Sequence, residues 1–463
     1  MANNYIKEES KNIPIVGIYD LVVVGGGLTG VMAAVSAARQ GLNTILIEKQ
    51  AYLGGVGVMG LPLQGFYDLE NNQIIKGLPD EFISRLRAYN GASPSFIQCE
   101  MHNPFLVIDP EMVKLVCQEM IIEAGVTLLL HTFASSLIMD SSIIKGLFIE
   151  NKSGRQCVVG NIFIDCSGDG DIAKAAGVPF TFGREIEHQS QASTLMFRLD
   201  NVDIEALIHR VLDKPEEYDL IPTLPRIQFT YNKQHILVGL GNFISKARKE
   251  GMHDIPWDRV CYITCLHDNS VMINMVHVEN LDATNGRQLT EIEIEGRAQI
   301  GPIHKFLKNY ITGFEHSTLA FSAPCSGIRE TRHIQGEYVL TENDIIEGYM
   351  PEDTIVVGGY PIDIHYSSPD STSDLEFKHV SPYGIPYRCL LPLHVDNLLI
   401  AGRCISASHR ALASLRVMGT CMGLGQAAGL AAVLAKKSNW LPKNVSAENL
   451  RESLVSIGAF IGN

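Results

Sequence analysis

The hydrophobic pattern at the start of the chain predicts a strand–turn–helix–strand unit. Residues 19–24 (YDLVVV) form a short apolar run of the kind that a buried parallel strand requires. The glycine-rich residues 25–30 follow, and the alanine-rich residues 31–39 predict a helix. Residues 44–47 are a second apolar strand, which ends at Glu48. This order, within about thirty residues, is typical of the βαβ unit of a dinucleotide-binding fold.

Apolar runs farther along the chain predict more elements of the same kind. We expect buried strands, a small antiparallel meander and a late return strand at residues 126–130, 135–149, 156–159, 162–165 and 398–401. Residues 110–124 predict an amphipathic helix with Asp109 as its N-cap, and residues 422–435 predict a helix of small residues. Together these elements indicate a parallel sheet with flanking helices and a small β-meander.

The pattern changes from about residue 181. Residues 261–266 and 271–278 flank a polar tetrapeptide and predict a β-hairpin. Residues 291–310 carry apolar side chains at helical spacing, and Thr290 with Glu293 predicts a capping box for that helix. We therefore predict an α/β protein in which a Rossmann-like domain is interrupted by an inserted mixed α/β capping domain. The expected limits are residues 1–180 for its first part, 181–375 for the insertion, and 376–463 for the return strand and C-terminal helix.

Composition narrows the class of protein. The chain has 463 residues, of which 46% are hydrophobic and 19% charged, and this balance excludes intrinsic disorder. A formal net charge of −14 disfavours binding to the negatively charged backbone of nucleic acid. The first ten residues lack the apolar segment of a signal peptide, and apolar runs such as residues 126–130 are far shorter than the roughly 20 residues of a membrane-spanning helix.

The ten cysteines are scattered along the chain. The closest pair, Cys261 and Cys265, lacks the spacing of a zinc or iron–sulfur site. We therefore expect reduced, mostly buried thiols, no metal and a cytoplasmic location. Neither an electron acceptor nor an oligomeric state follows from the sequence, which is compatible with a homo-oligomer.

Gly25, Gly27 and Gly30 form a G-x-G-x-x-G motif between the first strand and the first helix. The first glycine makes the turn, the second admits a pyrophosphate, and the third lets helix and strand pack closely. Glu48 lies 18 residues after Gly30, where a carboxylate can accept hydrogen bonds from a ribose diol. Residues 55–60 repeat the string without a preceding strand, so we interpret them as a glycine loop beside the cofactor rather than a second dinucleotide site.

A second group of residues lies near the C-terminus. The return strand runs into Gly402 and Arg403. Small residues recur at helical spacing at Gly425 and Gly429, which predicts a helix face that a neighbouring backbone can approach closely. The N-terminus of this helix, near residues 420–423, is expected to point at a ring that gains negative charge on reduction.

In combination these segments resemble the FAD-dependent oxidoreductase family with a glutathione-reductase-type FAD domain, near the fumarate reductase and succinate dehydrogenase flavoproteins. The resemblance rests on residues 20–41, 45–55, 163–177, 327–344 and 397–432. It implies that FAD lies extended across the first domain, with Phe133 and Ala134 beside the adenine. Arg403 stands where relatives often carry aspartate, and would place a cation near the phosphates or the ribityl chain. The residues expected at FAD are Gly25, Gly27, Leu28, Thr29, Gly30, Glu48, Lys49, Gly54, Gly55, Ala134, Gly168, Gly402, Arg403, Cys421 and Gly423.

The candidate substrate residues are arginines and histidines. Arg329 and Arg332, three residues apart, can clamp a carboxylate if they face one way, although Arg332 can equally pair with Glu330 or Glu337. His365 and His409 are candidate proton donors or acceptors. Two further residues that could line the site are Tyr383 and Arg388.

The resemblance implies hydride transfer between flavin N5 and a small organic substrate that bears a carboxylate or carbonyl group. Two alternatives stay open. One is a flavin-dependent amine or alcohol oxidase or a monooxygenase. The other is an electron-transfer subunit that needs a partner protein.

Overall fold

The computed structural model describes residues 9–99, 101–185, 188–218, 234–365 and 375–462. The described residues form a seven-stranded sheet in the order β3-β2-β1-β6-β5-β4, with β18 also paired to β6. Its strands are β1 (Ile15–Val24), β2 (Thr44–Ile47), β3 (Thr127–Leu129), β4 (Phe133–Asp140), β5 (Ile143–Asn151), β6 (Gly154–Asp165) and β18 (Leu398–Ile400). Strands β1, β2, β3, β6 and β18 pair in parallel, whereas β4, β5 and β6 form an antiparallel meander. The predicted α/β class with a Rossmann-like sheet is therefore confirmed.

Two strand limits differ from the sequence prediction. Strand β6 is one continuous element, although we predicted a break between residues 159 and 162. It pairs with β1 on one side and β5 on the other, and ladder bonds on both sides hold it straight. Strand β1 begins at Ile15 rather than at the predicted residue 19. The side chain of Ile15 is exposed, but its backbone still pairs with β6.

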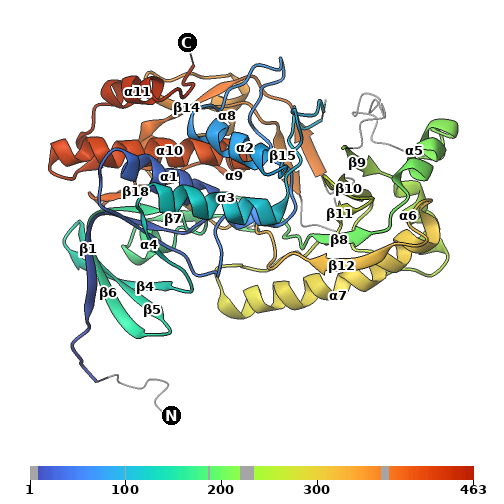
Figure 1. Ribbon diagram of the computed structural model, residues 1–463, viewed down its shortest axis with the longest axis horizontal. Helices are drawn as coiled ribbons and strands as arrows, with labels where there is room; N and C mark the ends of the chain where they lie inside the picture. Colours follow the sequence, from blue (N-terminus) through green and yellow to red (C-terminus); the bar gives the residue numbers. More distant parts are fainter. Residues whose placement is uncertain (1–8, 100, 186–187, 219–233, 366–374, 463) are drawn as a thin grey trace.

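Helices cover the parallel part of the sheet (Figure 1). Helix α3 (Pro110–Glu123) begins at the predicted N-cap, since the Asp109 carboxylate accepts hydrogen bonds from the backbone of Glu111 and Met112. The other helices of this part are α1 (Leu28–Arg39), α2 (Leu78–Ala88), α4 (Asp171–Ala175), α8 (Glu342–Ile346), α9 (His409–Leu415), α10 (Met418–Ala435) and α11 (Ala447–Ser456).

A second sheet, in the order β12-β8-β11-β10-β9, lies beyond the first. Its strands are β8 (Phe197–Asp200), β9 (Ile236–Gly239), β10 (Val260–Thr264), β11 (Val271–Ile273) and β12 (Thr318–Ser322), accompanied by α5 (Ile204–Asp213), α6 (Gly241–Lys249) and α7 (Gly286–Tyr310). The antiparallel pairing of β10 and β11 confirms the predicted hairpin. The predicted capping box at Thr290 is wrong, because α7 begins one turn earlier and Asn285 caps it.

Three short two-stranded ladders lie outside the two large sheets. They are β7 (Phe180–Phe182) with β13 (Arg332–Ile334), β14 (Thr354–Gly358) with β17 (Tyr383–Pro386), and β15 (Ile362–His365) with β16 (Leu375–Lys378). Ile355, Ile362 and Tyr383 belong to the apolar core that α1 and α10 share, whereas the second core is built mainly from residues 195–323. The domain limits given above remain predictions, and residues 355–364 pack with the first sheet's helices.

Helix α10 is longer and more apolar than the sequence pattern suggested. The stretch Met418–Ser438 has the length and composition of a membrane-spanning helix, so the expectation that no apolar run approaches this length is corrected. Within the protein, 89% of an 18-residue stretch of this helix is buried. This burial is typical of the central helix of a globular core.

Glycines allow α10 to lie directly against α1. A Cβ atom at Gly425 would lie 2.1 Å from the carbonyl oxygen of Thr29, and one at Gly429 would lie 2.3 Å from that of Ala33. Only hydrogen fits at both positions, which confirms the close backbone approach predicted for this helix face.

Gly429→Ala tests this packing. The added methyl group collides with a main-chain oxygen, so we expect the free energy of unfolding to fall by about 1–3 kcal/mol. Gly286→Ala is the matched control, because nothing lies within 4 Å of its Cβ position. Thermal denaturation of both purified variants would check the prediction, and equal stability of the two would contradict it.

Candidate active site

The first glycine motif forms a tight turn at the end of β1. Gly25 has φ +102° and donates a backbone hydrogen bond to Ile47 at 2.8 Å. A Cβ atom at Gly30 would lie 1.9 Å from the carbonyl oxygen of Gly25, so the turn and α1 pack without room for a side chain. Gly27 caps α1 without a side-chain hydrogen bond, and residues 27–29 line a cavity. Such a helix N-terminus has free N–H groups for a phosphate.

Glu48 is fixed at the end of β2. Its Oε2 accepts a hydrogen bond from the backbone N–H of Gly26 at 2.5 Å, and its Oε1 accepts one from Gln50 at 2.7 Å. The side chain is buried and still lines the cavity, beside Lys49. A carboxylate held in this way is suited to accept further hydrogen bonds from a ribose diol.

The second glycine string lies against the first. Residues 55–58 form a short 3-10 helix, η1 (Gly55–Val58), after Gly54, whose N–H donates to the oxygen of Gly26 at 2.9 Å. A Cβ atom at Gly55 would lie 2.8 Å from the Cα of Gly27. The two loops therefore form one glycine-lined cradle, and Gly55 contributes to the cavity wall.

The opposite wall carries a partly buried ion pair. Arg403 Nη2 lies 2.7 Å from Asp169 Oδ1, and Thr331 Oγ1 donates to the same oxygen at 2.9 Å. Burial alone would raise the pKa of Asp169, but the charge of Arg403 holds it below its usual value. Gly168 lies beside this pair, since its Cβ position is 3.0 Å from Arg403 Nη2. Asp169 thus compensates the charge of Arg403.

The start of α10 reaches the cavity through Val417, Met418 and Cys421. Cys421 Sγ lies 3.4 Å from the carbonyl oxygen of Arg416, and burial raises the pKa of its thiol to about 12. Gly423 is on the other side of the helix, where a Cβ atom would lie 3.1 Å from Val356. The expectation that Gly423 faces the cofactor is therefore corrected, because α10 begins at Met418.

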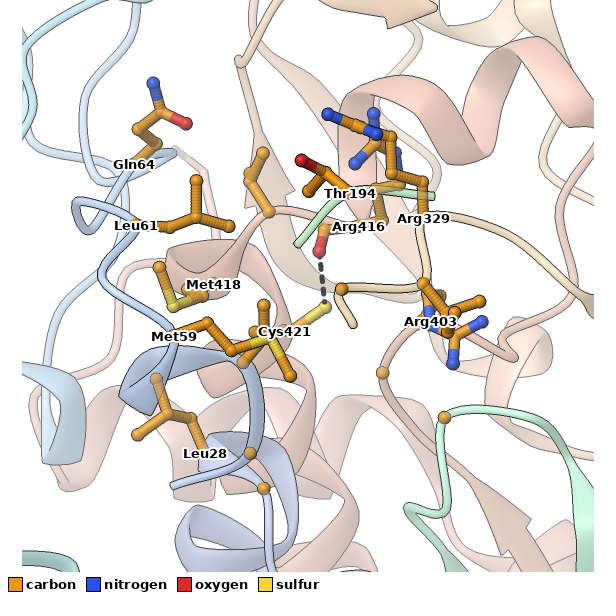
Figure 2. A pocket seen from close by; sticks show the side chains of 18 of the residues that line it. Leu28, Met59, Leu61, Gln64, Thr194, Arg329, Arg403, Arg416, Met418 and Cys421 are labelled. Atoms are coloured by element: carbon orange, nitrogen blue, oxygen red, sulfur yellow. Dashed lines mark hydrogen bonds between the residues drawn. The ribbon is translucent and has the colours of Figure 1, made fainter. Parts of the chain in front are cut away.

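The cavity continues from the cradle to the second sheet and has a volume of about 370 Å³. Its far wall includes Ile236 and Val238 of β9, Ile263 of β10 and the nearby Trp257. Figure 2 shows Leu28, Met59, Leu61 and Met418 along one side. These apolar surfaces exclude water from the middle of the site.

Two arginines lie on the other side of the cavity, next to Thr194 (Figure 2). Arg329 Nη1 donates to the carbonyl oxygen of Ala192 at 2.5 Å. Arg416 Nη2 donates to Gln191 Oε1 at 3.2 Å and to the carbonyl oxygen of Asp363 at 3.0 Å, while its buried Nε has no hydrogen-bond partner within the described part of the chain. Burial, followed by the charge of Arg416, lowers the pKa of Arg329 to about 10.

Asp363 and His365 lie on β15 beside these arginines and also line the cavity. His365 Nε2 is 3.4 Å from Asp363 Oδ1. Tyr360 and Gln64 complete this polar wall, with the Tyr360 hydroxyl 3.4 Å from both Gln64 Oε1 and Asp363 Oδ2. Positive and negative groups therefore line this end of the cavity as well as the glycine cradle, with apolar side chains between the two ends.

Comparison with known proteins identifies the cofactor. The family described as FAD dependent oxidoreductase matches residues 20–454. The chain belongs to the FAD-dependent oxidoreductase family. It is an enzyme whose cofactor is FAD, and the glycine cradle, the uncapped start of α1 and the fixed Glu48 carboxylate fit the two phosphates and the ribose of this dinucleotide.

Individual relatives match smaller parts of the chain. A 3-oxosteroid 1-dehydrogenase of Mycolicibacterium smegmatis is 36% identical over 103 residues, which are 21% of this chain and 17% of the relative. Digeranylgeranylglycerophospholipid reductase 2 of Methanothermobacter thermautotrophicus is 26% identical over 192 residues, 40% of this chain and 48% of the relative. The matched segments thus span less than half of either curated relative.

Among solved structures, a geranylgeranyl bacteriochlorophyll reductase-like protein from Thermoplasma acidophilum has 14% sequence identity and a TM-score of 0.47. The alignment covers 96% of this chain and 84% of that one.

Most of the residues expected at FAD line the cavity: Gly25, Gly27, Leu28, Thr29, Glu48, Lys49, Gly55, Gly168, Gly402, Arg403 and Cys421. Gly30 and Gly54 shape the cradle from behind, as their contacts with Gly25 and Gly26 show. Ala134 lies on β4 outside the cavity lining, so its place beside the adenine remains a prediction.

The expected pairing of Arg329 with Arg332 is corrected. Residues 328–331 have no helical structure and lead into strand β13, and of the two arginines Arg329 lines the cavity whereas Arg332 does not. Arg332 Nη1 instead donates to Asp171 Oδ1 at 2.8 Å and to the carbonyl oxygen of Asp169 at 2.9 Å. Arg416, a residue to which the sequence reasoning assigned no role, takes its place beside Arg329.

Three other candidates are also held away from the cavity. His409 Nδ1 donates to Glu330 Oε1 at 2.7 Å, the Tyr383 hydroxyl bonds Ser414, and Arg388 pairs with Asp353. The sequence reasoning also missed Thr194, Tyr360 and Asp363. No local motif marks these residues, because loops and strands distant along the chain bring them together.

Glu330 is the centre of a buried charge cluster behind the arginine wall. His409 Nδ1 and His333 Nε2 lie 2.7 and 2.8 Å from its Oε1, and the backbone N–H of Gln191 donates to its Oε2 at 2.9 Å. Burial alone would raise the pKa of Glu330, but hydrogen bonds from the two histidines lower it to about 2. A carboxylate whose folded pKa is depressed stabilises the fold above its unfolded pKa, and this contribution is lost as the pH falls towards 2.

Glu330→Gln removes the charge that faces both histidines. We expect a loss of about 3–5 kcal/mol of stability near neutral pH and a shallower fall in melting temperature between pH 5 and pH 3. Thermal unfolding of the FAD-loaded protein over this pH range checks both effects. Glu337→Gln, at an exposed neighbouring position, is the control, and an equal response of the two variants would contradict the prediction.

Proposed function

We propose that this enzyme oxidises or reduces a small organic anion by moving a hydride between a substrate carbon and flavin N5. The observation that carries the proposal is the pair Arg329 and Arg416, which meet in the FAD cavity with few partners of their own. When bound, FAD supplies the two-electron acceptor or donor.

The charges at this end of the cavity favour an anionic substrate. The two guanidinium groups repel each other, since burial first and then the charge of Arg416 lower the pKa of Arg329. Asp363 is the acidic side chain beside them among the described cavity residues. A substrate carboxylate would relieve this repulsion and could accept the orphaned N–H of Arg416. Planar guanidinium groups are well matched to carboxylates.

The apolar wall supports a substrate with a hydrocarbon body. Ile236, Val238 and Ile263 face the cavity from the second sheet, and Trp257 lies nearby. With the carboxylate held by the arginines, the adjoining carbons would lie in the dry part of the cavity. We therefore favour formation or reduction of a C–C double bond next to a carboxylate or carbonyl group, a reaction type in line with relatives named as a dehydrogenase and a reductase. The cytoplasmic location and the oligomeric state remain predictions.

Arg329→Lys and Arg416→Lys test the anion site, because lysine keeps the charge but loses the planar fork. We expect carboxylates such as succinate or 3-phenylpropionate to bleach the oxidised flavin without oxygen, and their amides not to. KM for the best carboxylate should rise about 10- to 100-fold in each variant, as the loss of a charge-assisted hydrogen bond implies. Arg332→Lys is the control and should change KM by less than about twofold.

Stopped-flow and steady-state absorbance measurements separate the outcomes. Unchanged KM in both cavity variants, or equal reaction of the amides, would contradict the anion site. Rapid reoxidation by air with release of peroxide or a hydroxylated product would instead favour an oxidase or monooxygenase. Turnover that requires a second protein would favour an electron-transfer subunit.

A further inference from the structure

We propose that His365 exchanges the proton of this reaction with the substrate, and that an anion bound by Arg329 and Arg416 makes His365 basic enough to do so. The inference rests on the proposed function and names the group that handles the proton. In the direction of oxidation, one substrate C–H bond breaks and its proton goes to His365 Nδ1. When bound, FAD would supply the acceptor for the hydride, which leaves the neighbouring carbon with the electron pair of its C–H bond. The electron pair of the deprotonated C–H bond forms the C=C bond between the two carbons.

The geometry of His365 suits this role. The side chain lines the cavity and is only 8% exposed. Its Nε2 faces Asp363 Oδ1 at 3.4 Å, whereas its Nδ1 is buried and, among the described residues, has no hydrogen-bond partner. The Asp363 carboxylate favours a proton on Nε2, which leaves the lone pair of Nδ1 available. Asp363 is thus a positioning residue, and Nδ1 is the atom that would receive the proton.

The other histidines near the cavity are less suited. His409 is bound to Glu330 and does not line the cavity. His102 does line it, but its Nδ1 lies 3.8 Å from Cys99 Sγ and its ring stacks on Tyr360. Burial raises the pKa of Tyr360 well above its usual value, so this hydroxyl stays neutral.

The charges around His365 explain the coupling to an anion. Asp363, Arg329 and Arg416 are the charged groups that act on His365 itself. Other titratable groups face the residues that pack on it. They are Tyr360, His102, Cys261 of β10, and His277, which stacks on Trp257. Burial, and then the charge of Arg329, lower the pKa of His365 to about 3, against the opposing charge of Asp363. Without substrate the imidazole is therefore neutral and weakly basic near pH 7.

A carboxylate on the arginines reverses part of this effect. It adds a negative charge next to Arg329 and Arg416, so the positive field at His365 falls and the pKa of His365 rises. The base is strengthened only when a substrate is in place. Below the raised pKa, anion binding must then be accompanied by uptake of a proton from solution, and this linkage can be measured without turnover.

Benzoate is a suitable probe, because its carboxylate has no neighbouring C–H pair that could be desaturated. Titration calorimetry of the oxidised FAD-loaded protein between pH 5 and pH 8, in buffers of different ionisation enthalpy, gives both Kd and the number of protons taken up. We expect uptake of up to one proton at the acidic end, and an affinity that rises by up to about tenfold for each pH unit lowered.

Variants assign the proton. His365→Gln keeps a donor towards Asp363 but cannot titrate, so it should bind benzoate without proton uptake and with a nearly constant Kd. His102→Gln, the matched control, should retain the uptake.

The outcomes distinguish this inference from the proposal on which it rests. Benzoate binding without proton uptake in the natural protein, or uptake that persists in His365→Gln, overturns the role of His365 and leaves the anion site intact. No binding of benzoate by the natural protein contradicts the anion site itself, and the inference then falls with it.

Discussion

The contact between α1 and α10 is the constraint on which the site depends. Gly425 and Gly429 let the C-terminal helix rest on the carbonyl oxygens of Thr29 and Ala33, in the helix that follows the first glycine turn. This contact joins the two ends of the chain. It places Met418 and Cys421 beside the FAD cradle, and the residues just before α10 carry Arg416 to the cavity. A side chain at Gly425 or Gly429 would displace α10 and, with it, the cavity wall that carries Arg416.

Buried charge follows a consistent logic around this contact. Arg403 is compensated by Asp169, and Glu330 by two histidines, so these groups stabilise the walls of the site. Arg329 and Arg416 differ, since within the described residues they donate to oxygen atoms of the backbone and of Gln191 rather than to a carboxylate. An anionic substrate would complete this positive charge, and on our proposal it would also raise the basicity of His365.

The two sheets present different kinds of residue to the cavity. The first sheet ends in glycines and in fixed carboxylates, which suit a dinucleotide. The second presents β-branched side chains to the same cavity, which suit a hydrocarbon. Between them, Thr194, Arg329 and Arg416 come from connecting segments, and Asp363 comes from the short strand β15.

The sequence alone determined the cofactor end, because its signals are local: Gly25, Gly27, Gly30 and Glu48 lie within one βαβ unit, and backbone geometry dictates their spacing. Local patterns also located α3 through Asp109 and the hairpin in the second sheet. They misplaced Arg332 and His409, because Arg332 begins strand β13 and pairs with Asp171, and His409 begins α9 and bonds Glu330, contacts that no local spacing predicts. Only the tertiary structure decided that Arg416, and not Arg332, lies beside Arg329. Arg329 and Arg416 are 87 positions apart in the chain, so packing rather than spacing brings them together.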